Sequence, residues 1–62
     1  MSRTTKLYRV HIGLIDSKGD ECANWDAKNV LAEDAAKAIS KARLGKNRYA
    51  ESVELVASNV RL

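Results

Sequence analysis

The sequence has few of the residues that cross-link a chain or bind a metal. Cys22 is the only cysteine and His11 the only histidine among the 62 residues. One cysteine excludes a disulfide within the chain, and one Cys with one His is too few for the usual four ligands of a structural zinc site. A domain of this size buries only about 60% of the surface that its unfolded chain exposes. Association is the remaining common support for so small a domain, so we expect a homodimer or higher homo-oligomer, without metal or cofactor.

Long apolar segments are also missing. No stretch approaches the roughly 20 apolar residues of a membrane span, and the basic N-terminal residues are not followed by the apolar run of a signal peptide. The lack of a cysteine pair fits a reducing compartment. These features predict a cytoplasmic protein that does not bind membranes.

The charges that are present are of both signs. The chain has 11 basic and 8 acidic residues, a formal net charge of +3, and 45% hydrophobic residues. This balance is typical of the surface of a folded domain and not of a disordered chain. We expect a single domain over residues 6–62, preceded by a flexible N-terminal tail at residues 1–5.

The first half of the chain predicts a β-hairpin. Apolar and polar residues alternate over residues 6–16, as in a strand with one buried face, and Gly19 lies in a turn-forming segment, DSKGDE. With a loop of even length, Ile12 faces Trp25 in the core. The same register pairs His11 with Asp26 on the opposite face.

The start of the helix decides between two folds. Asn24 could cap a long helix, which would remove the second strand, whereas Asp34 would cap a shorter helix and leave the hairpin intact. Asn and Asp favour caps over helix interiors, and only the hairpin buries Trp25, so we favour Asp34. The helix AAKAISKARL would end at Gly45 as the left-handed C′ residue. Its buried stripe would consist of Ala35, Ala38, Ile39 and Ala42.

A third strand is predicted at residues 53–62. The connection through a helix should bring it parallel to the second strand and beside the first. The predicted fold is therefore α+β with the order ββαβ. It has a mixed, parallel and antiparallel, three-stranded sheet in the order 2-1-3, with one helix packed on one face. The last strand would be an edge open to pairing with another chain.

The run VLAEDAAKAISKA, a strand end followed by a helix start, is typical of many small phage proteins. The order of hairpin, helix and strand resembles the small podovirus inhibitors of host RNA polymerase and some anti-CRISPR proteins. The resemblance covers most of the chain and is one of architecture, with no motif that carries over a functional residue. It implies tight, non-catalytic binding to a macromolecule in the cytoplasm of a bacterial host, with inhibition of defence or transcription.

The open face of the predicted sheet is the first candidate binding surface. An apolar patch rimmed by charge is typical of a partner site, and the charged residues of this face would be Arg9, His11, Asp26 and Lys28. The pair His11 and Asp26 could suggest acid–base chemistry. A sheet with a single helix leaves little room for a substrate pocket, so we predict no catalytic residues and no enzyme.

The second candidate surface is a basic segment at the end of the predicted helix. Its residues are Lys41, Arg43, Lys46, Arg48 and Tyr49. Such a segment could bind an acidic protein surface, or it could grip phosphates while Tyr49 stacks on a base. The expected function is binding and inhibition of a host protein or protein–nucleic-acid machine. The alternatives are a nucleic-acid-binding module and an oligomeric sponge that sequesters a small signalling nucleotide.

Overall fold

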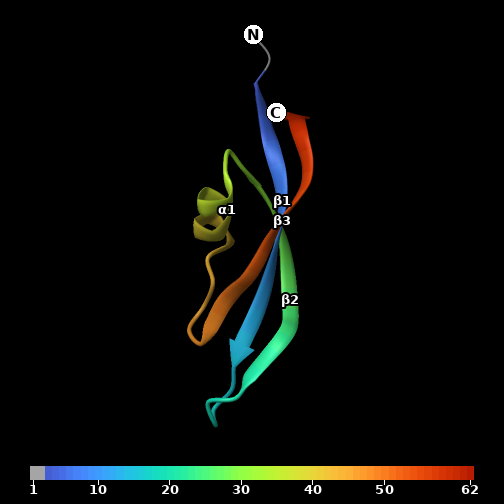
Figure 1. Cartoon of the computed structure of the whole chain (residues 1–62). Helices are drawn as coiled ribbons and strands as arrows, with labels where there is room; N and C mark the ends of the chain where they lie inside the picture. Colours follow the sequence, from blue (N-terminus) through green and yellow to red (C-terminus); the bar gives the residue numbers. More distant parts are fainter. Residues whose placement is uncertain (1–2) are drawn as a thin grey trace.

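The computed structural model describes residues 3–62 and contains three strands and one helix. They follow in the order β1 (Thr4–Ile15), β2 (Glu21–Ala32), α1 (Ala35–Ala42) and β3 (Arg48–Arg61). β1 lies in the middle of the sheet, in the order β2-β1-β3 (Figure 1), which confirms the predicted ββαβ fold. β1 is antiparallel to both neighbours. The expectation of a mixed sheet is therefore wrong: β2 and β3 run in the same direction but β1 separates them.

The sheet extends closer to the N-terminus than predicted. β1 begins at Thr4, which pairs with Arg61. Thr4 and Thr5, which were assigned to a flexible tail, therefore belong to the central strand, and residues 1 and 2 of that tail lie outside the described residues. The molecule is long and narrow, 51 × 16 × 13 Å. The two ends of the chain lie at the same end of the sheet (Figure 1), where Leu62 N donates to Arg3 O over 3.1 Å.

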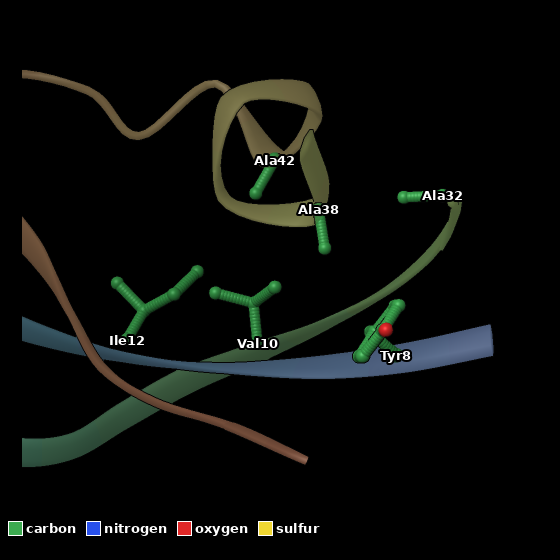
Figure 2. Packing of buried hydrophobic residues seen from close by; sticks show 6 residues of the cluster. All are labelled: Tyr8, Val10, Ile12, Ala32, Ala38 and Ala42. Atoms are coloured by element: carbon green, nitrogen blue, oxygen red, sulfur yellow. The ribbon is translucent and has the colours of Figure 1, made fainter. Parts of the chain in front are cut away.

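The core lies between α1 and the middle of one sheet face. Figure 2 shows Ala38 and Ala42 of α1 above the β1 residues Val10 and Ile12. Small helical side chains let α1 lie close to the strands, and Ile12 and Val10 are the largest fully buried side chains. Within residues 3–62 the buried hydrophobic side chains are Tyr8, Val10, Ile12, Ala32, Ala38 and Ala42. Half of the predicted helical stripe is thus confirmed, whereas Ala35 and Ile39 are exposed.

α1 begins where the sequence predicts and ends earlier. Asp34 is the N-cap, and its Oδ1 accepts a hydrogen bond from Lys37 N over 2.8 Å. The left-handed residue at the C-terminal end is Arg43, with φ 51°, so the assignment of Gly45 to that position is wrong. The turn at Arg43 lets Leu44 pack against the core, which a continued helix would not do. Within residues 3–62 no helix has the length and apolarity needed to cross a bilayer.

A loop of odd length and a bulge in β2 change the predicted hairpin register. The loop has five residues, 16–20, between the paired Ile15 and Glu21, and not the even number predicted. Pairing runs regularly up to Ile12 opposite Asp26 and resumes with Leu14 opposite Cys22. Three β2 residues, 23–25, therefore oppose Gly13, and Asn24 among them has φ 55°. Left-handed backbone is more accessible to Asn than to most residues, which explains why the bulge lies there.

The observed register differs from the predicted one by one residue along the whole hairpin, and two of the changed pairings decide the surfaces. Ile12 faces Asp26 and not Trp25, and Trp25 is 44% exposed instead of buried. His11 is opposite Ala27, so it does not pair with Asp26.

Candidate binding surfaces

Arg9 and His11 lie on the sheet face that α1 leaves uncovered. Side chains alternate along a strand, so these residues point away from the face that carries Val10. Arg9 Nε donates to Asn29 Oδ1 over 3.2 Å. Glu54 Oε1 lies 4.0 Å from Arg9 Nη1 and 3.3 Å from His11 Nε2. One carboxylate on β3 thus offsets the charge of Arg9 and also contacts the His11 ring. The exposed ion pair with Arg9 is worth at most about 1 kcal/mol.

An apolar row crosses the same face next to these ion pairs. Leu7 of β1 is opposite Leu31 of β2 and Ala57 of β3. Leu31 is 41% exposed, and Val56, the extra residue of a β3 bulge beside Ala57, is 42% exposed. We call residues 7, 31 and 57 with Val56 the Leu7 row. The open face therefore combines an apolar row with a polar one, as the sequence predicts, although partly with other residues.

Asp26 and Lys28 do not belong to this face. Asp26 is opposite Ile12, and its Oδ1 accepts from Ala27 N over 2.8 Å. Lys28 Nζ reaches over the other face to donate to Ala42 O at the end of α1, over 3.0 Å. The expected four-residue cluster is therefore divided between the two faces. The cause is the hairpin loop, whose five residues, 16–20, put the pairing one residue away from the prediction and so exchange the faces of β2. The bulge shifts the pairing by two residues and leaves the faces as they are.

Basic side chains gather around the C-terminal end of α1. We call this group the basic end: Lys28, Lys41, Arg43, Lys46 and Arg48. Lys41 Nζ donates to Leu31 O over 3.1 Å, so it joins α1 to β2 as Lys28 does. Arg43 and Lys46 are exposed, and within residues 3–62 their side chains form neither a hydrogen bond nor an ion pair. Lys28 is an addition to the predicted basic segment.

Trp25 is a surface residue of the basic end that sequence reasoning missed. The guanidinium carbon of Arg48 lies 4.5 Å from the centroid of the Trp25 ring, a cation–π contact. Arg48 N donates to Gly45 O over 3.2 Å, which fixes the strand start against the preceding loop. An isolated large aromatic in an alternating strand indicates a core residue, and the one-residue difference in register turns Trp25 away from the core.

Tyr49 packs within the sheet. Its ring covers Gly13, because a Cβ on that glycine would lie 2.2 Å from Tyr49 Cζ. Burial raises the pKa of Tyr49 above its ordinary value, and the carboxylates of Glu21 and Glu51 raise it further. The side chain of Glu51 accepts from Asn24 N over 2.9 Å. The ring expected to stack on a base therefore already packs on the backbone, next to negative charge.

Little in the described part of the chain resembles a small-molecule or metal site. Across residues 3–62 there is no group of three or more His, Cys, Asp and Glu that could hold a metal ion. A shallow pocket of about 150 Å³ is lined by Thr4, Thr5, Lys6, Glu33 and Asn59. Ligand pockets are usually about 300–1,000 Å³, so the extended faces are the better candidates for binding.

Comparison with known proteins adds no relative. No protein-family model matches the chain, and searches of curated proteins and of solved structures found no match.

Proposed function

We propose that this chain is a small non-catalytic binding protein, phage-encoded and cytoplasmic in its bacterial host, that inhibits a host protein or protein–nucleic-acid machine. The basic end would contact an acidic protein surface of that target. The observation that carries the proposal is the exposed stack of Arg48 on Trp25 beside unpaired cations. The resemblance to small phage inhibitors rests on the ββαβ order, which the chain has.

The Trp25–Arg48 stack has the chemistry of an interface anchor. Tryptophan and arginine are enriched among the few interface residues that supply most of the binding energy. The stack restrains both side chains before binding, so less conformational entropy is lost when a partner covers them. Arg43 and Lys46 beside it would steer an acidic partner towards this surface.

The surroundings of the basic end favour a protein over a nucleic acid. A nucleic-acid groove combines free cations with aromatic platforms. Here the ammonium groups of Lys28 and Lys41 are held on backbone carbonyls, and Tyr49 packs on Gly13. Glu51 accepts from the backbone of Asn24, next to Trp25. Mixed charge around an aromatic anchor suits a protein surface, whereas fixed carboxylates repel a phosphate backbone.

The test is capture of targets from a bacterial lysate by the whole protein and by two variants with matched charge. Arg43→Glu with Lys46→Glu reverses charge at the basic end. Arg3→Glu with Arg61→Glu makes the same change at the other end of the sheet. We expect the first variant to bind its target more slowly, with added salt masking the difference, and the second to bind normally. Trp25→Ala should weaken binding roughly 30-fold, for a loss of about 2 kcal/mol.

Nuclease treatment of the lysate separates the two partner classes. Capture that survives the nuclease supports a direct protein target, and capture that disappears shows that a nucleic acid is the ligand. Normal binding by both the Trp25→Ala variant and the charge-reversed basic end would contradict the proposal.

A further inference from the structure

We infer that the open face of the sheet is a homodimer interface, in which the Leu7 row of one copy packs on the Leu7 row of the other. This surface is distinct from the basic end. The inference therefore stands or falls separately from the proposed function.

The edges of the sheet are poor places for association. On β2, the outward backbone groups Ala27 N and Leu31 O are taken by the side chains of Asp26 and Lys41. On β3, the pairing with β1 shifts register at three points, and Asn59 has φ 57°. Side-chain caps and bulges are devices that keep edge strands from pairing with other chains. The edge pairing expected for the last strand is therefore obstructed, which leaves the faces.

The overlap of two open faces reaches the lower end of biological interfaces. With the axis on the Leu7 row, residues 3–11 are covered, which is roughly 30 Å at about 3.3 Å per residue. Over a molecule 16 Å wide this overlap is about 500 Å² of each copy, and about 1,000 Å² in total is the size expected of a biological interface. Within residues 3–62 the core of a single copy is small, and its largest fully buried side chains are Ile12 and Val10. Burial of a second face would supply the support that a domain of this size lacks.

The charges of this face fit a copy of itself better than a foreign partner. Glu54 offsets the charge of Arg9 and contacts His11 within the same copy, so the face has little net charge to select a partner of opposite sign. If the two-fold axis lies along the Leu7 row, across the strands, the apolar rows coincide and the strands of the two copies run in opposite directions. The row of Arg9 and Glu54 then faces the row of Thr5 and Val60 in the other copy. An apolar centre with already paired charges nearer the rim is the usual anatomy of a protein interface.

The experiment is sedimentation equilibrium of the full chain with two variants of exposed leucines. Leu31 lies on the open face, and Leu55 is opposite Tyr8 on the α1 face with 53% exposure. We expect the wild type to dimerise at micromolar concentration. Leu31→Glu should raise the dissociation constant at least tenfold, whereas Leu55→Glu should leave it unchanged. The charge-reversed basic end, Arg43→Glu with Lys46→Glu, should also dimerise normally.

Circular dichroism checks that each variant is folded, and Leu31→Ser provides a milder change if Leu31→Glu unfolds the chain. A second readout is the melting temperature, which should rise with protein concentration for the wild type and for Leu55→Glu, because only the folded state dimerises. A wild type that remains monomeric at a hundred micromolar would overturn the inference. So would a dimer that tolerates both Leu31 variants or that Leu55→Glu dissociates.

Discussion

At the scale of single residues, Gly13 leaves room for the Tyr49 ring in the middle of the sheet. It lies on the central strand where bulges interrupt both neighbours, and the Tyr49 ring occupies the space that a side chain would take. Any Cβ there would displace the ring, since the contact would be 2.2 Å. The glycine and the tyrosine are therefore expected to depend on each other.

A double-mutant cycle tests this dependence. Gly13→Ala should lower the free energy of unfolding by about 1–3 kcal/mol, as overpacking commonly does. In a Tyr49→Ala background the same change should be neutral or stabilising, because Ala in a strand is better than Gly by roughly 0.5–1 kcal/mol. Denaturant titration of the four proteins measures the coupling. Equal costs in the two backgrounds would show that the ring does not cover Gly13.

Tyr49 also makes stability depend on alkaline pH. The unfolded chain releases the phenolic proton near pH 10, about the ordinary value, while the folded protein has the raised pKa and keeps it to higher pH. The stabilising effect is thus complete below about pH 10 and is lost as pH rises through the folded pKa. We expect a smaller alkaline decline for Tyr49→Phe than for the wild type, measured by denaturation at several pH values.

The denaturation experiment at alkaline pH needs a control for Lys37. Its hydrogen bond and attraction to Glu33 raise its pKa, so its contribution to stability is also lost as pH rises through the alkaline range. Both proteins should therefore be compared in a Lys37→Gln background. An identical alkaline decline with Tyr49 and with Phe at that position would exclude Tyr49 as the source.

At the scale of elements, α1 depends on its N-cap because it has only eight residues. Asp34→Ala removes the acceptor of Lys37 N and should destabilise the protein by about 1 kcal/mol. Asp34→Asn keeps a capping side chain and is the matched control. Thermal unfolding should rank the three proteins with Asp and Asn above Ala. If Asp34→Asn lowers the melting temperature as much as Asp34→Ala does, the charge of Asp34 stabilises α1 and its capping hydrogen bond does not.

The same element shows what sequence reasoning could reach. The cap at Asp34 follows from a local rule, and so does the packing of Ala38 and Ala42. The register of β2 does not, because it depends on the five-residue loop and on the bulge opposite Gly13. Alternation alone places Trp25 in the core and Asp26 opposite His11. The alternation of residues within one strand does not determine which residues of another strand it pairs with.

At the scale of the whole molecule, the one-residue difference in register also explains why the candidate surfaces differ from the predicted ones. Arg9 and His11 lie on the open face as predicted, whereas Lys28 and Trp25 lie at the basic end. The end of α1 is also hard to predict from the sequence. The left-handed residue there is Arg43, which precedes the packed Leu44, and no glycine marks the position. The sequence predicts the kinds of residue that form the two surfaces, whereas the fold is needed to assign each residue to one surface or the other.

The position of β1 in the sheet has a consequence for the order in which the chain can fold. β1 is synthesised before β2, α1 and β3, and it pairs on one side with β3, the last of these four elements. The β1–β2 hairpin can close as soon as its turn is made, but the central strand keeps one side unpaired until residues 48–61 emerge. Contacts between such distant segments close slowly because of the entropy of the intervening loop. Completion of the sheet is therefore a late event, and the nascent hairpin is the species that chaperones would meet.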